Sequence, residues 1–461
     1  MQKQNYKLRV KEILDVTEGK LIIGNEETVF ENFCKDTREI KPNDVYLGIK
    51  GEKNNGSIYF ENAFEKGAIG AILQDIEIVE QQKEKYANKF IILVKDTIKA
   101  MQQIATYKRK KYDIPVVAIT GSVGKTSTKD IVASVMNEKF KTLKTQGNYN
   151  NHIGVPLTIF NLKDEEAMCI EMGMNHLGEI SVLSKIAQPT VAIITNIGTA
   201  HIGNLGSREN ILKAKLEIID GMKEDGTIII NNDNDLLHKW YLENKENYNI
   251  ITYGIQNESD YMAENIIFGE SSSKYTLKGT KQEIIVPVGG EHFVQNSLCA
   301  IAVGNVFNIP IKNIVEGISK FELTKKRMDI EKINDITIIN DFYNANYDSM
   351  KAALDYMSNI KGKRKVAVLG DMLELGEYSK QLHEKIGEIV AKNKIDILIT
   401  VGKEAKNIAE VAQNKIEKTI VCDTNEQAIE QINRIKNKND CILLKASNGM
   451  NFGEILEGIK K

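Results

Sequence analysis

A glycine-rich turn between an apolar run and a helical stretch is the strongest chemical signal in this 461-residue chain. The run VVAIT, residues 116–120, continues through GSVGKTSTKD, residues 121–130, into a stretch with helical spacing of apolar residues. Backbone N–H groups of such a turn can surround phosphate oxygens, and a helix N-terminus favours negative charge. Lys125 would bring a positive charge to the terminal phosphates, and Thr126 a hydroxyl ligand to Mg²⁺. The segment therefore predicts an ATP-binding phosphate loop.

The match to the general Walker pattern is incomplete. G-x-x-x-x-G-K-[ST] requires glycine at the position of Ile119, so a shorter T-G-x-x-G-K-T-[ST] form is present. The alternative is a structural glycine turn in which Gly-Lys-Thr occurs by chance. The strand before the turn and the helix after it favour ATP binding. The loop residues predicted to contact ATP are Gly121, Ser122, Val123, Gly124, Lys125, Thr126 and Ser127.

Two ionisable side chains follow other apolar runs and would lie at the same edge as this loop. Glu171 stands in AMCIEMGM, residues 167–174, and His201 follows TVAIITNIG, residues 190–198. Open parallel sheets bind ligands beyond the carboxyl ends of their strands, and Mg²⁺ takes one or two carboxylates in addition to phosphate oxygens. Taken singly, a solvated glutamate or a structural histidine is at least as common. Because both residues would lie at the same edge as the phosphate loop, their position favours a metal site more than either residue does alone.

Spacing alone assigns no role to several other charged residues. Lys213 and Lys215 belong to the helical stretch RENILKAKLEII, and a lysine on a helix is usually solvated. Arg327, Asp329 and Asp341 flank a second α/β region, where an ATP site between two domains would need charged partners.

The elements that must position these residues alternate between strands and helices. Residues 1–110 read as short strands and turns, and Pro115 marks a boundary after the basic stretch YKRKKYDIP. Apolar runs and helical segments then alternate, which is typical of a parallel sheet covered by helices. Residues 255–288 predict an antiparallel patch, followed by a helix at about 293–307. A second α/β series begins near residue 321 and is typical of a doubly wound sheet.

Length and composition limit the class of protein. At roughly 150 residues per domain, the chain has room for about three domains. Its 61 Lys and Arg residues against 63 Asp and Glu residues leave a formal charge of -2, so binding of nucleic acid is not expected. No apolar run reaches the ~18 residues of a membrane span, and the N-terminus lacks the core of a signal peptide. The five scattered cysteines form no CxxC, which fits a reducing cytoplasm.

Longer motifs throughout the chain resemble the Mur ligases of peptidoglycan synthesis and their folate-ligase relatives. The matching segments are DTREIKPNDVYLGIKGEKNNG (36–56), TGSVGKTSTKD (120–130), TQGNYNNHIGVPLTIFNL (145–162), EMGMNHLGEI (171–180), TNIGTAHIGNLGSRENILKAKLEI (195–218), GEHFVQN (290–296), KKRMD (325–329), INDFYNANYDSM (339–350), VLGDMLELGEYSKQLH (368–383) and KASNGM (445–450). NYNNHIGVPLT, YNAN and LGDMLELG favour the branch of the family that uses D-alanyl-D-alanine. The Asp-Asn-Pro-Arg motif of the diaminopimelate-adding branch is absent.

The resemblance implies an α/β protein with three domains and an ATP-dependent amide-bond ligase activity. Residues 1–110 would form a small mixed α/β domain for the UDP-sugar, and residues 111–320 a central P-loop-type ATPase with a parallel sheet. Residues 321–461 would form a Rossmann-like doubly wound domain that binds the incoming dipeptide and part of ATP. The expected reaction adds D-alanyl-D-alanine to UDP-N-acetylmuramoyl-tripeptide through an acyl phosphate and yields ADP and phosphate. A cytoplasmic monomer without membrane insertion or nucleic-acid partner is expected.

Carried over by position, the resemblance also implies roles for individual residues. The implied ligands of Mg²⁺, with two ions expected, are Thr126, Glu171, His201 and Lys215. The implied catalytic residues are Lys125, Lys215 and His201. Lys215 matches the lysine that the family carbamylates, and a carbamate would turn this cation into a carboxylate-like ligand. Asn296, Arg327 and Asp341 resemble the adenine, phosphate and ribose contacts. The implied substrate contacts are Thr37, Arg38, Asn148, Asn151, Asn344 and Asn346.

The chain departs from the family pattern at four positions, namely Phe293, Asn340, Tyr347 and Asn448. These departures concern the adenine pocket and the C-terminal loop. Another ligase of the superfamily, such as a folylpolyglutamate synthase, is one alternative, and an ATP-binding regulatory or scaffold protein is another. Whether the third residue of the peptide is lysine or diaminopimelate stays open at this point.

Overall fold

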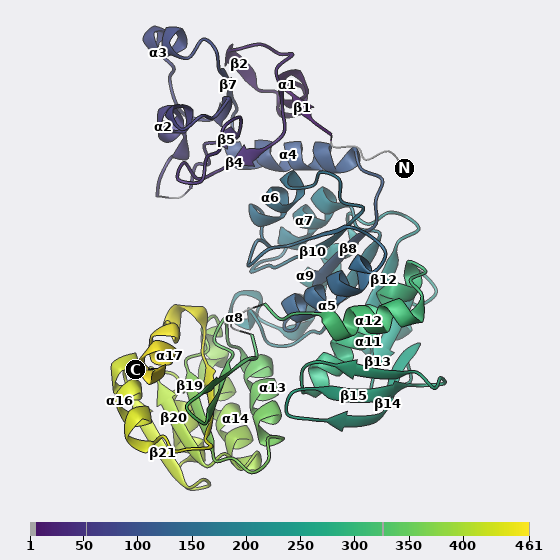
Figure 1. The fold of residues 1–461 in the computed structure, drawn as a ribbon, viewed down its shortest axis with the longest axis vertical. Helices are drawn as coiled ribbons and strands as arrows, with labels where there is room; N and C mark the ends of the chain where they lie inside the picture. The colour runs from purple at the N-terminus through teal and green to yellow at the C-terminus, as the bar shows by residue number, and fades with distance from the viewer. Residues whose placement is uncertain (1–5, 52, 325–326, 461) are drawn as a thin grey trace.

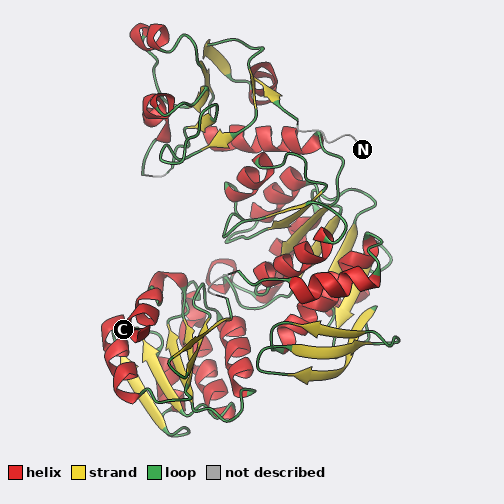
Figure 2. Cartoon of the chain, viewed as in Figure 1, coloured by secondary structure: helices red, strands yellow, loops and turns green. Residues whose placement is uncertain are grey.

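The computed structural model contains three α/β units in chain order and describes residues 6–51, 53–324 and 327–460 (Figure 1). Each unit has its own main sheet with helices packed around it (Figure 2). The central unit lies between the N-terminal and C-terminal units. The predicted α/β fold class is confirmed. Outside the described residues lie both ends of the chain, position 52 and Lys325 and Lys326 of the KKRMD segment.

The N-terminal unit has a five-stranded sheet in the order β2-β7-β6-β5-β4, in which only β2 runs antiparallel to its neighbour. The strands are β2 (Lys20–Ile23), β4 (Phe33–Cys34), β5 (Val45–Leu47), β6 (Gly70–Leu73) and β7 (Phe90–Leu93), with β1 (Leu8–Arg9) paired separately to β3 (Val29–Phe30). The helices are α1 (Val10–Thr17), α2 (Phe60–Glu65), α3 (Glu80–Lys85) and α4 (Thr97–Lys110). The small mixed α/β unit that the resemblance implied is present, and its helices are additional to the short strands and turns read from residues 1–110.

Helix α4 joins the N-terminal unit to the central unit and lies across the end of the latter (Figure 1). Residues 107–110 of the basic stretch before the predicted boundary form its last turn. Lys108 and Arg109 are buried there, and the Lys108 Nζ donates to the Phe160 carbonyl at 2.7 Å. The Arg109 guanidinium donates to the carbonyls of Ala187, Tyr112, Ile114 and Gln188. Burial lowers the pKa of Lys108 to about 8 and that of Arg109 to about 10.

The central unit has a nine-stranded sheet in the order β16-β15-β14-β13-β12-β11-β8-β10-β9. Its strands are β8 (Val116–Thr120), β9 (Thr142–Lys144), β10 (Ala167–Glu171), β11 (Val191–Ile194), β12 (Thr227–Asn231), β13 (Asn249–Gly254), β14 (Tyr261–Phe268), β15 (Ser273–Leu277) and β16 (Glu283–Val286). Strands β8 to β14 pair in parallel, and β14 to β16 form the predicted antiparallel patch. Strand β8 lies between β10 and β11, which sets the surroundings of the loop that follows it.

Eight helices of the described central unit complete it: α5 (Lys125–Asn137), α6 (Gly154–Phe160), α7 (Glu179–Ala187), α8 (Ile202–Leu205), α9 (Arg208–Leu216), α10 (Asp235–Asn244), α11 (Glu291–Val306) and α12 (Ile311–Lys320). The helix predicted at about 293–307 is α11. The segment after α12 is bound to α5, because the Asp130 carboxylate accepts from the Thr324 backbone N–H at 3.2 Å and hydroxyl at 2.7 Å. The exit from the central unit is therefore anchored on the helix that follows the glycine turn.

The C-terminal unit has a six-stranded sheet in the order β17-β18-β22-β19-β20-β21, parallel except for the β17–β18 pair. The strands are β17 (Asp329–Ile333), β18 (Ile336–Asn340), β19 (Lys365–Gly370), β20 (Ile397–Val401), β21 (Lys418–Cys422) and β22 (Cys441–Lys445). The helices are α13 (Tyr347–Ser358), α14 (Ser379–Lys392), α15 (Lys406–Ala412), α16 (Asn425–Ile435) and α17 (Gly453–Lys460). Adjacent residues Ile338 and Ile339 of β18 belong to separate cores, so helices cover both faces as in a doubly wound sheet. Among the described helices none is long and apolar enough to span a bilayer.

The hydrogen bonds from Arg109 to backbone carbonyls lead to a prediction about stability. Arg109→Ala would leave buried acceptors without a donor, so we expect the free energy of unfolding to fall by about 2–4 kcal/mol. Urea denaturation followed by circular dichroism measures the change. Lys110→Ala removes a neighbouring exposed cation and should change it by less than about 0.5 kcal/mol. Equal effects of the two substitutions would contradict this role of Arg109.

Candidate active site between the central and C-terminal units

The glycine turn after β8 has the backbone that a phosphate loop requires. Gly124 has a left-handed backbone with φ 81° and immediately precedes α5. A Cβ atom at Gly121 would lie 1.9 Å from the Thr195 Oγ1, so only glycine fits beside this neighbouring strand end. The Lys125 Nζ donates to the Gly121 carbonyl at 2.8 Å and so lies across the turn. The turn, the lysine and the helix N-terminus together can bind an anion.

The loop after β11 supports this turn from one side. The Asn196 Oδ1 accepts from the backbone N–H groups of Ser122 and Val123, each at 3.0 Å. The Thr195 hydroxyl donates to the Val123 carbonyl at 2.6 Å, and the Gly198 N–H donates to the Ser122 Oγ at 2.9 Å. The conformation of the turn thus depends on a segment more than seventy residues further along the chain.

Glu171, at the end of β10, lies on the other side of the turn. Its carboxylate is buried and accepts from the Thr126 hydroxyl and from the Asn150 Nδ2, both at 2.8 Å. Two of the predicted metal ligands, Thr126 and Glu171, are therefore brought together. Burial lowers the pKa of Lys125, with the charge of Arg327 acting in the same direction and that of Glu171 opposing it.

The two lysines of α9 have different environments. Lys213 is exposed, whereas Lys215 is only 2% exposed. Burial lowers the pKa of Lys215 well below its ordinary value, and the positive charge of Lys125 adds to the effect. A neutral amine is the nucleophilic form that can react with carbon dioxide, so the chemistry of Lys215 is compatible with a carbamate.

His201 faces a carboxylate of the C-terminal unit. It has a left-handed backbone with φ 63°, and its Nδ1 lies 2.8 Å from the Glu374 Oε2. The sequence analysis did not identify Glu374 as a partner. The described residues contain no group of three or more His, Cys, Asp and Glu side chains placed to hold a metal ion. His201 and Glu171 line the same cavity, but the contact of His201 is with Glu374.

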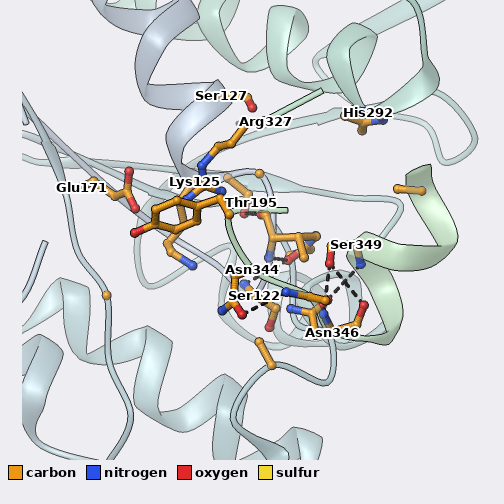
Figure 3. Close-up of a pocket in the computed structure, with 18 of the residues that line it drawn as sticks. Ser122, Lys125, Ser127, Glu171, Thr195, His292, Arg327, Asn344, Asn346 and Ser349 are labelled. Carbon is orange, nitrogen blue, oxygen red and sulfur yellow. Dashed lines mark hydrogen bonds between the residues drawn. The ribbon is translucent and has the colours of Figure 1, made fainter. Parts of the chain in front are cut away.

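A cavity of about 390 Å³ lies between the central and C-terminal units (Figure 3). The lining residues that the sequence analysis predicted are Ser122, Val123, Gly124, Lys125, Ser127, Asn151, Glu171, His201, Asn296, Arg327, Asp341, Asn344 and Asn346. The predicted residues Gly121, Thr126, Asn148, Lys215, Thr37 and Arg38 are not part of its lining. Gly121 and Thr126 support the site through their hydrogen bonds with Lys125 and Glu171, whereas Lys215 is buried near enough to Lys125 for its charge to act on the Lys215 pKa.

Residues of the C-terminal unit give one wall of the cavity a mixed charge. The Arg327 guanidinium lies over the Tyr343 ring, 4.1 Å from its centroid. The Lys445 Nζ lies 2.7 Å from the Asp341 Oδ2 and donates to the Asn344 carbonyl at 2.8 Å. Burial lowers the pKa of Lys445, and Asp341 opposes this shift. The sequence analysis did not name Lys445 as a site residue. Its position at the end of β22, which places it at the ligand-binding edge of the sheet, could have indicated it.

The opposite part of the cavity has aromatic and amide groups. His292 and Phe293 have ring centroids 4.2 Å apart, and the buried Asn296 Nδ2 has no hydrogen-bond partner among the residues that the structure describes. Asn231 and Gln295 line the same region. A flat ring with hydrogen-bonding edges, such as a nucleobase, would satisfy this combination. Burial lowers the pKa of His292 to about 4, so this residue is neutral at neutral pH.

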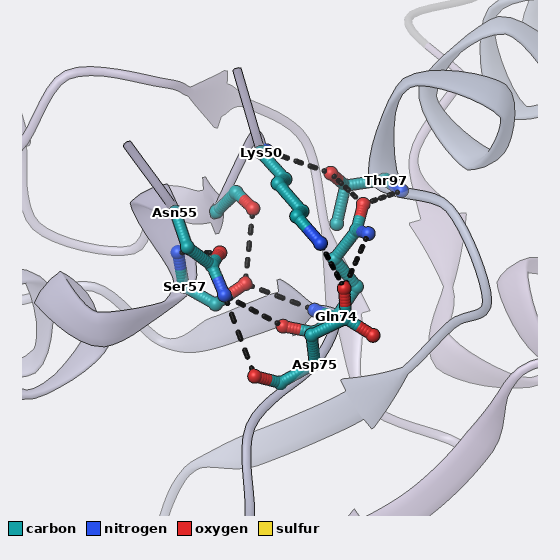
Figure 4. A network of polar contacts seen from close by, with 7 residues as sticks. Lys50, Asn55, Ser57, Gln74, Asp75 and Thr97 are labelled. Atoms are coloured by element: carbon teal, nitrogen blue, oxygen red, sulfur yellow. Dashed lines mark hydrogen bonds and ion pairs between the residues drawn. The ribbon is translucent and has the colours of Figure 1, made fainter. Parts of the chain in front are cut away.

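A second group of polar residues lies at the carboxyl ends of the parallel strands of the N-terminal sheet (Figure 4). The Lys50 Nζ lies 2.6 Å from the Asp75 Oδ2, and the Gln74 Oε1 accepts from the N–H and hydroxyl of Thr97 at 2.7 and 2.8 Å. Thr37 and Arg38 follow β4 at the same edge, and the Arg38 guanidinium pairs with Asp36. These two predicted substrate residues belong to this edge and not to the central cavity. Asn148 is exposed, whereas the Asn151 Oδ1 accepts from the N–H groups of Ile153 and Gly154 at the start of α6, at 3.1 and 2.9 Å.

Comparison with known proteins gives a consistent set of relatives. Residues 119–304 match the family described as Mur ligase middle domain, and residues 326–448 match Mur ligase, glutamate ligase domain. A UDP-N-acetylmuramoyl-tripeptide–D-alanyl-D-alanine ligase of Bacillus subtilis is 38% identical over 98% of both chains. A crystal structure of MurF from Acinetobacter baumannii has a TM-score of 0.89 at 29% identity over 99% of both chains. MurF ligase from Thermotoga maritima in complex with ADP has a TM-score of 0.81 at 27% identity, covering 93% of this chain and 97% of that one.

The lowered pKa of His292 makes a prediction about acid stability. Between pH 6.5 and about 4 the unfolded chain binds a proton at His292 that the folded protein does not, so stability is lost as the pH falls through this range. We therefore expect the urea concentration at the midpoint of unfolding to fall less between pH 7 and pH 4.5 for His292→Gln than for the unsubstituted protein. His176→Gln, at an exposed histidine, is the control. An unchanged pH dependence in His292→Gln would refute the prediction.

Proposed function

Because the chain belongs to the Mur ligase family, we propose that it joins D-alanyl-D-alanine to UDP-N-acetylmuramoyl-tripeptide in the synthesis of peptidoglycan precursors. It is an ATP-dependent ligase, and ATP is cleaved to ADP and phosphate. The observation that supports this assignment best is the 38% identity to the Bacillus subtilis ligase over 98% of both chains. The phosphate loop and the polar wall of the C-terminal unit face one cavity, as a ligase with three substrates needs.

The reaction requires activation because a carboxylate and an amine do not condense in water. A carboxylate oxygen of the tripeptide attacks the γ-phosphorus of ATP, and ADP leaves. The dipeptide amine then attacks the carbonyl carbon of the acyl phosphate, the tetrahedral intermediate expels phosphate, and the nitrogen loses a proton. Lys125, Arg327 and the N–H groups at the start of α5 would stabilise the charge on the transferred phosphoryl group.

The residues beside the phosphate loop fit Mg²⁺. Thr126 and Glu171 provide a hydroxyl and a carboxylate oxygen 2.8 Å apart, and phosphate oxygens are the ligands that Mg²⁺ adds to one or two carboxylates. Bound Mg²⁺ would polarise the phosphoryl oxygens and neutralise their charge. Carbamylated Lys215 would supply a second carboxylate-like group, and the lowered pKa of its amine favours this modification. His201 would have to exchange its contact with Glu374 to act as a ligand.

We assign one substrate region to each part of the chain. The polar edge of the N-terminal sheet, including Thr37 and Arg38, would bind the UDP-sugar within residues 1–110. The central part, residues 111–320, would bind the phosphates and the adenine, with Asn296 at the base. Residues 321–461 would bind the ribose through Asp341 and the dipeptide near Asn344 and Asn346. We infer that the chain acts as a cytoplasmic monomer, as its resemblance to the Mur ligases implies.

The assignment predicts a requirement for both peptide substrates. Phosphate release from ATP and Mg²⁺ should need UDP-N-acetylmuramoyl-tripeptide and D-alanyl-D-alanine together, with the pentapeptide product detected by mass spectrometry. Parallel assays with lysine and with diaminopimelate at the third peptide position identify the preferred substrate. Release with a folate and glutamate would favour a folylpolyglutamate synthase instead. No release with any pair would favour a regulatory or scaffold protein.

The buried lysine predicts a second outcome. Lys215→Ala should lower kcat about 100-fold or more, because a charged group near the transferred phosphoryl group is lost. A high concentration of bicarbonate should restore part of the activity. Lys213→Ala, two residues away and exposed, is the matched control and should keep full activity. A ¹³C-bicarbonate carbamate signal that is present in the unsubstituted protein and absent in Lys215→Ala tests the modification directly, and full activity of Lys215→Ala would disprove the role.

A further inference from the structure

The loop after β11 contacts two separate parts of the molecule. We call residues 195–206 the bridging loop. On the side of the central unit, Thr195, Asn196 and Gly198 hold the phosphate loop through hydrogen bonds to Ser122 and Val123. On the other side, the Gly203 N–H donates to the Glu374 carbonyl at 3.2 Å, and the Tyr378 hydroxyl donates to the Gly206 carbonyl at 2.7 Å. The bridging loop therefore links the phosphate loop to the C-terminal unit.

One carboxylate of the C-terminal unit binds the middle of this loop. The Asp348 Oδ2 accepts from the Thr199 backbone N–H at 2.7 Å and from the Thr199 hydroxyl at 2.9 Å. A Cβ atom at Gly198 would lie 2.2 Å from the same oxygen, so the close approach depends on glycine at that position. Thr199 is two residues from His201 and adjacent to Gly198, which binds Ser122 of the phosphate loop. Hydrogen bonds to an ionised acceptor are the stronger kind, so this contact has the properties of a specific link.

Asp348 also stands on the turn that positions cavity residues. It lies in the first turn of α13, whose start is stabilised by reciprocal hydrogen bonds between Asn346 and Ser349. Asn346 and Ser349 line the cavity, whereas Asp348 points to the bridging loop. The same rigid turn thus presents Asn346 to the cavity and Asp348 to the support of the phosphate loop.

We propose that Asp348 is a positioning residue that sets the C-terminal unit relative to the phosphate loop by binding Thr199. The inference rests on the ligase function proposed above. Attack of the dipeptide amine requires that groups of the C-terminal unit hold the dipeptide at the acyl carbon while the phosphate loop holds the phosphoryl group. Asp348 is not among the residues that line the cavity, so it acts through the geometry of the two units. The contacts of Asn196 and Thr195 with the phosphate loop lie within the central unit and do not need Asp348.

The proposal predicts a split between nucleotide binding and ligation. Asp348→Ala should lower kcat/KM for D-alanyl-D-alanine roughly tenfold to 100-fold, the effect of losing hydrogen bonds to a charged group. The affinity for ADP, measured by calorimetry, should change less than about twofold, because the phosphate loop keeps its own support. Asp348→Asn should recover part of the activity, since its amide oxygen is still an acceptor. Asp355→Asn is the matched control on α13, because Asp355 binds Lys351 and Asn393 within the C-terminal unit.

A double-mutant cycle separates positioning from general destabilisation. Thr199→Val removes the hydroxyl donor of the same contact, so the combined variant should lose little more kcat/KM than Asp348→Ala alone. The proposal is wrong if the effects of the two single substitutions on kcat/KM multiply in the combined variant. It is also wrong if kcat/KM for Asp348→Ala lies within twofold of that of the unsubstituted enzyme.

Hydrogen exchange tests the contact independently of activity. The peptide that contains Thr199 should exchange about tenfold faster in Asp348→Ala than in the unsubstituted protein or in Asp355→Asn, because its N–H loses the acceptor. Unchanged exchange would refute the link even if no ligation were observed. Absence of ligation in the unsubstituted protein, with faster exchange in Asp348→Ala, would instead refute the proposed function and leave the contact between the units established.

Discussion

The site depends on the position of β8 between β10 and β11 in a parallel sheet. Parallel pairing brings the carboxyl ends of all three strands to one edge, so the phosphate loop, Glu171 and the bridging loop meet there. The fit is close, because Gly121 leaves no room for a Cβ atom against Thr195. A reversed neighbour would send Glu171 or the bridging loop to the far edge of the sheet. Every side-chain contact in the site therefore depends on this order and direction of the strands.

The burial of charged groups is the second constraint, and neighbouring groups of opposite charge compensate for it. The chain has a formal charge of -2, yet Lys125, Arg327 and Lys445 reach the cavity from different elements. Burial disfavours the positive charge of Lys125 and Lys445, and the nearby carboxylates of Glu171 and Asp341 partly restore it. Anionic substrates would add to this compensation. A protein without net positive charge can thus bind strongly anionic substrates at one place.

The two junctions between units are built differently. Between the N-terminal and central units, Lys108 and Arg109 of a continuous helix donate to backbone carbonyls, which makes a buried and extensive contact. The central and C-terminal units meet through side-chain contacts such as those of Asp130 with Thr324 and of Asp348 with Thr199, and a cavity lies between the two units. The second junction borders the cavity, so it is the one at which a change in a single side chain can alter the geometry of the reaction.

The sequence by itself determined the features that depend on neighbouring residues. The phosphate loop, the strand ends at Glu171 and before His201, the antiparallel patch and the doubly wound C-terminal series follow from local spacing, and all of these elements are present. The helical spacing of Ala100, Met101, Ile104 and Ala105 in α4 was also readable but was overlooked.

Only the tertiary structure decided which of two similar lysines is buried. Lys213 and Lys215 have the same local sequence environment, and packing of α9 buries one and exposes the other. The pairing of His201 with Glu374, of Asp341 with Lys445 and of Thr199 with Asp348 joins residues 104 to 173 positions apart, counted from their sequence numbers. Burial and long-range hydrogen bonds depend on where whole elements pack, which no local pattern encodes.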